Sequence, residues 1–248
     1  MTDLPPLDRV LIVAPHPDDE VIGTGGLVQR AIAAGGAVHV AILTGGGNNP
    51  WPQRAIYRKW RVTTADQREW IGRRIHESTR GLSRLGAPAG CVSFLDFPDQ
   101  GLSRLARAND DRVTRAIASA VAGFRPTLVI APSRFDLHGD HRAASWFTHE
   151  AVAKRVPIAT YVVHGRAPAP RTLFVIRLEA HEQAAKRGAI ESHASQLLLS
   201  RQRFLSHARA TETYYEPEYD ISGLDSRLTE TIANLRQMAQ AVAGVRQG

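Results

Sequence analysis

Two short polar stretches carry the residue types that metal-dependent hydrolysis needs. Residues 15–20, Pro-His-Pro-Asp-Asp-Glu, place one imidazole and three carboxylates within five positions, and residues 136–141 add two carboxylates and two imidazoles. Adjacent carboxylates repel one another, and their burial is costly unless a cation offsets the charge. Two imidazoles and one carboxylate are the ligand set of catalytic zinc and of some ferrous sites. Because the remaining groups could take a proton from water or stabilise a developing oxyanion, the stretches indicate metal-assisted hydrolysis.

A simpler explanation of the first stretch is that its acidic residues only stabilise the start of a helix. The positions of the two stretches favour chemistry instead. An apolar run at residues 9–14 precedes the first stretch, and another at residues 127–131 precedes the second, so each follows a predicted parallel strand. In an open α/β sheet the ligand crevice lies outside the carboxyl ends of the strands. We therefore expect the two stretches to converge.

Strand and helix patterns alternate along most of the chain. The further predicted strands are residues 37–43, 91–95, 160–164 and 173–178. This alternation predicts an α/β fold, namely a single-domain, Rossmann-like three-layer sandwich with a mostly parallel sheet. Helical patterns at residues 180–209 and 226–245 are expected to cover a face or an edge of the sheet, and residues 214–220 are expected to be irregular.

The composition excludes several protein classes. The chain has 248 residues, of which 43% are hydrophobic and 22% charged, as in an ordinary folded protein rather than a disordered one. Its single cysteine, Cys91, excludes an internal disulfide and a thiolate-rich zinc module. The chain contains no apolar run long enough for a membrane span, and its first residues lack the pattern of a secretory signal. We therefore expect a cytoplasmic protein.

The positive charge of the chain is concentrated in one segment. The net charge is +7, and residues 50–86 hold nine basic and three acidic residues with four interleaved tryptophan or tyrosine residues. Such a segment could face nucleic acid, a membrane surface or an anionic glycan, or it could be a solvated helix with arginines lying over apolar surface. We favour an anionic or lipid-linked glycoconjugate, with peripheral membrane contact through residues 50–86, and do not expect nucleic-acid binding. The sequence indicates no oligomeric state.

The two polar stretches resemble the motifs of the LmbE/PIG-L family of zinc-dependent N-acetylglucosaminyl deacetylases. The matching residues are Ala-Pro-His-Pro-Asp-Asp-Glu at 14–20, Gly23, Gly25, Gly26 and His-Gly-Asp-His at 138–141. Weaker matches extend the resemblance over residues 8–200 and leave a C-terminal helical extension at residues 201–248. The resemblance implies one deacetylase domain over residues 1–248, acting on a small-molecule or lipid-linked amino sugar.

The resemblance also implies a metal site and a general base. His16, Asp19 and His141 would hold the metal, which is expected to be Zn²⁺, with Fe²⁺ or another divalent ion as the alternative. Asp18 would be the general base that deprotonates the attacking water.

Four further residues receive roles in the same way. His138 would be the imidazolium that stabilises the oxyanion, and Asp140 would be its supporting carboxylate. Arg74 and Asp99 fall where the family contacts the sugar. The chain departs from the family at Gly139, where proline is usual, and this residue loosens the turn that carries His138.

Most other histidines are expected to lie at the surface of helices or strands; these are His39, His76, His149, His164, His181 and His207. His193 belongs to a weaker match, so it either lines the pocket or packs on the sheet. The activity that follows is removal of acetyl from an N-acetylated amino sugar. Two alternatives are an amidase acting on another acyl amine, and a basic module that binds nucleic acid or membrane and keeps a vestigial site.

Overall fold

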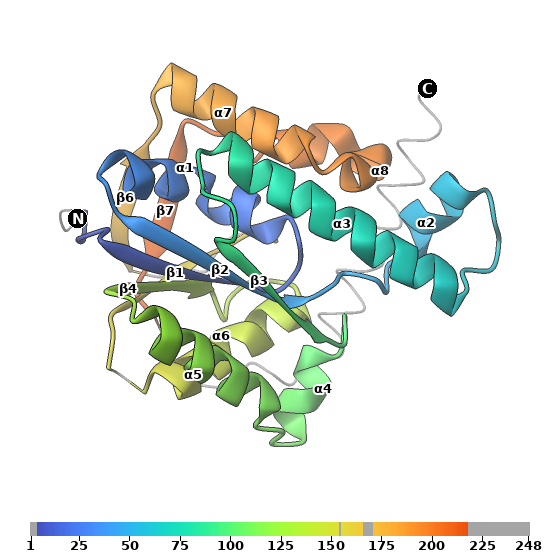
Figure 1. Cartoon of the computed structure of the whole chain (residues 1–248), viewed down its shortest axis with the longest axis horizontal. Coiled ribbons are helices and arrows are strands. Elements are labelled where there is room, and N and C mark those ends of the chain that lie inside the picture. Colours follow the sequence, from blue (N-terminus) through green and yellow to red (C-terminus); the bar gives the residue numbers. More distant parts are fainter. Residues whose placement is uncertain (1–3, 154, 166–170, 218–248) are drawn as a thin grey trace.

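The fold is built around a seven-stranded sheet, shown in Figure 1. The computed structural model describes residues 4–153, 155–165 and 171–217. The strands are β1 (Arg9–Ala14), β2 (Ala37–Thr44), β3 (Val92–Phe97), β4 (Leu128–Pro132), β5 (Ile158–Tyr161), β6 (Thr172–Arg177) and β7 (Thr211–Tyr215). Their order is β3-β2-β1-β4-β5-β7-β6; the first five are parallel and β7 is antiparallel to both of its neighbours. This arrangement confirms the predicted α/β fold with a mostly parallel sheet.

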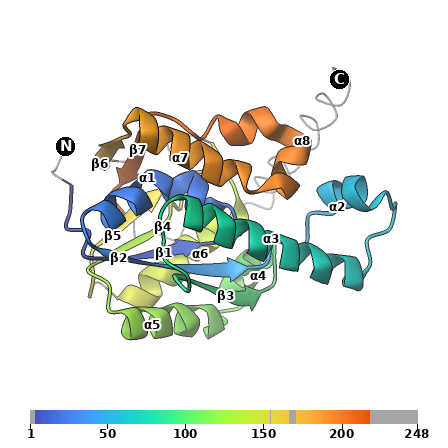
Figure 2. The same ribbon diagram turned by 45° about the horizontal axis from the view of Figure 1, so that its top comes forward.

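Helices cover both faces of the sheet. They are α1 (Asp19–Ala33), α2 (Pro50–Tyr57), α3 (Thr64–Arg84), α4 (Leu102–Arg107), α5 (Arg112–Phe124), α6 (Gly139–Val152), α7 (Ala180–Glu191) and α8 (Ala194–Leu205). Figures 1 and 2 show α1, α3 and α7 on one face and α4, α5 and α6 on the other, which gives the three layers. Of the helices that the structure describes, none combines the length and apolar character needed to cross a membrane.

The central strand β1 explains why the sheet needs helices on both sides. Val10, Ile12 and Ala14 join the apolar core beneath α1 and α7, whereas Leu11 and Val13 join the core beneath α5 and α6. Each of these five side chains is fully buried. A strand that is buried on both faces reads as a continuous apolar run, which is the pattern by which the sequence predicted it.

The C-terminal part of the described chain differs from the sequence prediction. The helical pattern at residues 180–209 forms two helices, α7 and α8, and the segment predicted to be irregular from residue 214 instead begins inside strand β7. The sheet therefore extends beyond residue 200, so the first part of the expected helical extension contains a strand. The predicted helix at residues 226–245 lies outside the described residues.

A buried carboxylate explains why β7 was missed. Glu212 lies on the buried face of the strand, where an apolar residue would be expected, and is 4% exposed. Its oxygens accept the backbone N–H groups of Gly26 and Leu27 and the ammonium of the buried Lys186. The charged Glu212 thus interrupts the apolar pattern of the strand, and it can be buried because α1 and α7 supply its hydrogen-bond donors.

The order in which strands join the sheet reverses between β1 and β4, because β2 and β3 lie on one side of β1, and β4 and β5 lie on the other. Strands β1 and β4 are parallel neighbours, with Val10 beside Leu128 and Ile12 beside Ile130. The helices that follow them, α1 and α6, pack on opposite faces of the sheet. A crevice at the carboxyl ends of such a pair of strands is the ordinary ligand site of a doubly wound sheet.

Candidate metal centre and active site

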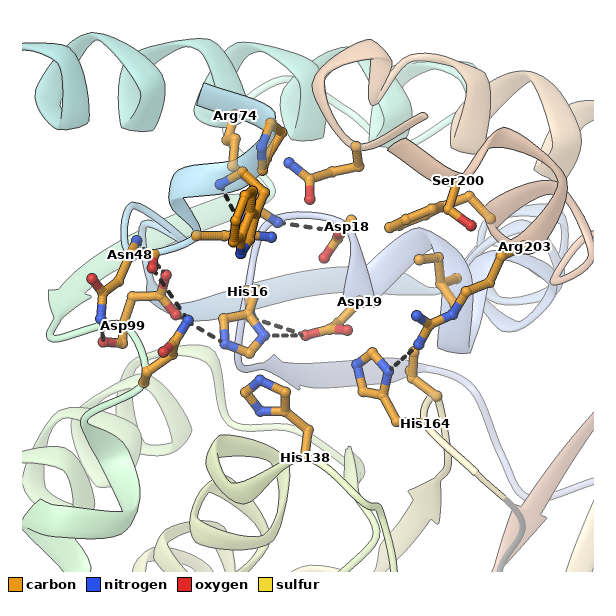
Figure 3. A pocket seen from close by; sticks show the side chains of 18 of the residues that line it. His16, Asp18, Asp19, Asn48, Arg74, Asp99, His138, His164, Ser200 and Arg203 are labelled. Atoms are coloured by element: carbon orange, nitrogen blue, oxygen red, sulfur yellow. Dashed lines mark hydrogen bonds and ion pairs between the residues drawn. The ribbon is translucent and has the colours of Figure 1, made fainter. Parts of the chain in front are cut away.

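The two polar stretches meet in this crevice (Figure 3). The ring centroid of His16 lies 4.9 Å from that of His138 and 5.5 Å from that of His141, and His138 and His141 are 5.2 Å apart. His16 follows β1, whereas the other two rings come from the turn before α6 and from its first residues. The convergence expected from the sequence is therefore present.

Asp19 lies between two of these imidazoles. Its Oδ2 atom is 3.1 Å from His16 Nδ1 and 3.1 Å from His141 Nε2. Ligand atoms about 2.0–2.1 Å from a tetrahedral zinc ion stand about 3.3 Å apart. Among the described residues, neither ring nitrogen of the buried His141 makes a well-aligned hydrogen bond. The donor set, the distances from Asp19 to both imidazoles and the unsatisfied nitrogens of His141 fit a divalent cation.

The electrostatics of these side chains also favour a cation. Burial would lower the pKa of His141, but the carboxylates of Asp136 and Asp19 outweigh this effect and raise it to about 10. Burial would raise the pKa of Asp19, but His141 and His16 hold it well below its usual value. Without a metal, His141 therefore keeps a proton between the carboxylates of Asp136 and Asp19. A metal cation would replace that proton as the positive charge of the site.

Other groupings of potential ligands overlap with this one. The sets His16–His138–His141, Asp19–His141–His164 and His16–Asp99–Asp140 each bring one ligand atom per residue within 4.8 Å of one another. His16 and His141 each occur in two of the three sets. The centre is thus rich in donors, and the three sets together include His16, Asp19 and His141, although not as one set.

Asp18 is held by contacts on its backbone and on its side chain. Its φ of 147° is rare for a residue with a side chain, and its N–H donates to Glu20 Oε2 at 2.9 Å. Its carboxylate pairs with Arg74 at 3.1 Å, and burial raises the pKa of Asp18 to about 7 despite that pair. A carboxylate with such a pKa and lying on the cavity wall is suited to accept a proton from water.

Arg74, expected to contact the sugar, directs its donors to the protein. Its guanidinium donates to the carbonyl oxygens of Pro17 and Gly46, in addition to pairing with Asp18. The side chain is 5% exposed, although it reaches the cavity wall. The structure thus places Arg74 where it fixes the loop and the carboxylate of Asp18.

His138 caps the N-terminus of α6. Its Nδ1 accepts the backbone N–H of Asp140 at 3.2 Å, and Gly139 is the first residue of the helix. Burial, with the nearby His16 and His141, lowers the pKa of His138 to about 4. A neutral ring whose Nδ1 accepts a hydrogen bond carries its proton on Nε2.

The carboxylate of Asp140 has other partners than His138. It accepts the backbone N–H groups of Gln100 and Leu102 at 2.7 and 3.0 Å, and lies 3.5 Å from His16 Nε2. Asp99 also faces His16 Nε2, at 3.3 Å, and accepts the N–H of Asn48. His16 thus lies between carboxylates on both of its ring nitrogens.

Two residues of the centre were missed by the sequence reasoning. Asp136 is 1% exposed, accepts the backbone N–H groups of His138, Val163 and His164, and lies 3.2 Å from His141 Nδ1. His164, predicted at the surface, instead has its ring centroid 4.9 Å from that of His141. The available signal was positional, because Asp136 belongs to the second polar stretch and His164 follows the next parallel strand, β5.

The remaining histidines divide between surface, core and cavity. His76 and His181 are exposed, as predicted, whereas His149 is buried and His207 lines the cavity, so the surface prediction is wrong for both. His193 is fully buried against Gly81 of α3, with Nε2 3.9 Å from Glu20 of α1, so it packs between helices rather than on the sheet.

The centre opens into a cavity of about 300 Å³. Its lining includes His16, Asp18 and Asp19. One wall comes from Asn48 and the start of α2, and the opposite wall from α8. The basic segment at residues 50–86 therefore contributes to the cavity, while its Arg54 guanidinium lies 4.9 Å from the ring centres of both Trp51 and Trp60.

Comparison with known proteins agrees with the geometry. The family model PIG-L, described as GlcNAc-PI de-N-acetylase, matches residues 11–152. A relative from Rhodococcus jostii, named 1D-myo-inositol 2-acetamido-2-deoxy-alpha-D-glucopyranoside deacetylase, is 34% identical over 158 residues, which cover 58% of this chain and 53% of that protein. The chain thus spans about half the length of the curated relatives it matches.

Two solved structures with different names share this fold. The A40926 pseudoaglycone deacetylase Dbv21 has a TM-score of 0.67 at 22% identity, over 85% of this chain and 97% of that one. The 4-carboxy-2-hydroxymuconate hydratase GalB of Pseudomonas putida has a TM-score of 0.59 at 21% identity, over 81% and 82%. At these identities the likeness concerns the fold alone. The family model, by contrast, covers more than half of the chain and includes both polar stretches, so the chain belongs to the PIG-L family.

Proposed function

We propose that this protein is a metal-dependent hydrolase that removes the acetyl group from an N-acetylated amino sugar. The observation that carries the proposal is the position of Asp19 Oδ2, 3.1 Å from both His16 Nδ1 and His141 Nε2, with the Asp18 carboxylate on the wall of the same cavity. Membership of the PIG-L family and the deacetylase name of the Rhodococcus relative support the substrate class.

His16, Asp19 and His141 would hold the metal, with Zn²⁺ as the first choice and Fe²⁺ or another divalent ion as the alternative. When bound, such an ion supplies Lewis-acid chemistry to the acetamide carbonyl and to the attacking water. Asp136 lies 3.2 Å from His141 Nδ1 and would orient that ligand.

Asp18 acts as the general base in this proposal. Its carboxylate takes a proton from the water as the water attacks the carbonyl carbon, and then returns the proton to the departing nitrogen. Arg74 keeps the carboxylate aimed into the cavity. Water and amide are thereby converted into acetate and a free amine with no other reactant.

His138 stabilises the oxyanion as a neutral donor in this proposal, rather than as the imidazolium expected from the resemblance. Because Nδ1 accepts the N–H of Asp140, Nε2–H is the free donor of the ring. A donor aimed at charge that develops only in the transition state makes the largest usual contribution to catalysis. Asp140 supports this arrangement through its backbone N–H, while its carboxylate ties the start of α6 to residues 100–102.

The sugar would lie between Asp99 and the start of α2. Asp99 is a hydrogen-bond acceptor on the cavity wall, and the Trp51 ring, 40% exposed, offers a flat apolar surface. A lipid-linked substrate and peripheral membrane contact through residues 50–86 belong to the same proposal, since this segment forms part of the cavity wall. The cytoplasmic location and the absence of nucleic-acid binding stay predictions.

The test is acetate release from a panel of N-acetylglucosaminides, with N-acetylated amines lacking the sugar as the comparison. We expect turnover of the sugars that is lost with a chelator and restored by a divalent metal. Equal turnover of the sugar-free amides would favour the general amidase. Metal-free protein that binds DNA in a salt-sensitive way and releases no acetate would favour the binding module.

A further inference from the structure

One wall of the cavity comes from α8 and the turn that follows it. The cavity-facing residues of α8 are Gln196, Ser200, Arg203 and Phe204, and His207 lies just beyond the end of the helix. The helix is kinked at Ser200, where φ is −158° and ψ is 58°. All of them lie beyond residue 152, where the match to the family model ends. His16, Asp18, Asp19 and His138 come from the matched stretch, whereas this wall comes from residues outside it.

Arg203 is a half-buried cation on this wall. Its Nη2 lies 3.1 Å from His164 Nδ1, and Figure 3 shows the side chain reaching from α8 toward that ring. Within the described residues, no carboxylate lies within 4.0 Å of its guanidinium; Asp18 and Asp136 act on it only from farther away. By contrast, the other arginine of the cavity, Arg74, pairs directly with Asp18.

A guanidinium has five N–H donors in a planar fork and is strongly stabilised by an anion that matches the fork. Arg203 has one acceptor, a histidine ring nitrogen, among the described residues. Partial burial of a cation without a counter-ion is unfavourable, so an arginine that lines a ligand cavity favours the binding of a negatively charged group there.

We propose that Arg203, on the α8 wall, forms a subsite for an anionic group, a carboxylate or a phosphate, carried by the amino-sugar substrate. The proposal rests on the proposed function and adds the charge of the substrate. His164 lies between Arg203 and the metal-side ring of His141, with its centroid 4.9 Å from that of His141. The anionic group would therefore lie on the α8 side of the metal centre, across the cavity from Asn48 and the start of α2.

Binding of the deacetylated amines tests the subsite without turnover. The metal-loaded protein is titrated in a calorimeter with glucosamine 1-phosphate, with a carboxymethyl glucosaminide and with neutral methyl glucosaminide. A charge-assisted, forked hydrogen bond predicts that both anionic amines bind about ten- to a hundredfold more tightly than the neutral one. Acetate release, measured separately, reports on the proposed function, so the two ideas can fail independently.

Variants two residues apart on α8 identify the source of the preference. Arg203→Gln is expected to abolish it. Arg201→Gln removes the same charge from an exposed arginine that pairs with Glu191 at 2.9 Å, and is expected to keep it. Arg203→Lys keeps the charge but loses the fork, so a reduced preference is expected, and this variant serves if the glutamine variant does not fold.

Equal affinity of the wild-type protein for the three amines would overturn the subsite. So would a preference that survives in Arg203→Gln, because the anion would then be held by the metal or by another residue. An undiminished preference in Arg203→Lys would overturn the forked contact.

Discussion

Replacing Asp18 by asparagine separates the role of a base from that of a metal ligand. The side chain keeps its size, and its backbone N–H can still donate to Glu20, while asparagine tolerates a positive φ better than most residues. Loss of a positioned general base costs about 10²- to 10⁴-fold in rate. We therefore expect kcat for acetate release to fall by that factor, with about one metal per chain retained.

The structure also predicts how much stability the Asp18→Asn variant loses. The Asp18→Asn substitution would leave the buried Arg74 without its carboxylate partner, but two carbonyl acceptors remain, on Pro17 and Gly46. A loss of about 1–3 kcal/mol is expected, which lowers Tm by a few degrees for a chain of this size. The assays are acetate release, metal content by mass spectrometry and a thermal melt.

The control is Asp19→Asn, which is expected to lose both metal and activity, since Asp19 Oδ2 faces both His16 and His141. The reasoning is refuted if the Asp18 variant loses its metal, because Asp18 would then be a ligand. It is refuted equally if that variant keeps wild-type turnover.

Three further results are expected. Without metal, the pKa of His141 is raised from 6.5 to about 10, so the protonated ring stabilises the fold fully below pH 6.5 and this stabilisation is lost as the pH rises toward 10. Urea unfolding at a series of pH values should show the loss of stability in metal-free protein and not in metal-loaded protein. Asp136→Asn should weaken metal binding about 10- to 100-fold, measured by competition with a chelator, because His141 loses the carboxylate at Nδ1; unchanged affinity would contradict the orienting role. Glu212→Gln should lower the free energy of unfolding in urea by about 3–5 kcal/mol, because Lys186, 2% exposed, loses its counter-charge. An unchanged free energy of unfolding would mean that the ion pair does not stabilise the fold.

The parts of the fold that the sequence predicts are those with one dominant physical signal. Residues 9–14 and 37–43 are apolar apart from Arg9 and His39 because both faces of these strands are covered by helices, and the strands lie within one residue of the prediction. The convergence of the two polar stretches follows from the same logic, since both come after strands that are neighbours in the sheet.

The remainder depends on contacts between distant segments. Glu212 can occupy a core position because α1 and α7 supply its hydrogen-bond donors. The sequence around Glu212 does not indicate those partners. His164 reaches the centre because β5 is parallel to β4, whereas the sequence shows only a histidine after an apolar run. Arg74 matches the family motif, but its use of Pro17 and Gly46 as acceptors depends on the packing of α3 against the first loop.

The insertion of β7 between β5 and β6 has a consequence for how the chain folds. Within the described residues, β6 pairs only with β7, which follows it by more than thirty residues, across α7 and α8. During synthesis β6 therefore leaves the ribosome with no strand to join, and the far edge of the sheet forms only after residue 215 has emerged. Such non-local pairing slows folding. A chain shortened to residue 200 would keep both polar stretches and yet expose an unpaired strand prone to aggregation.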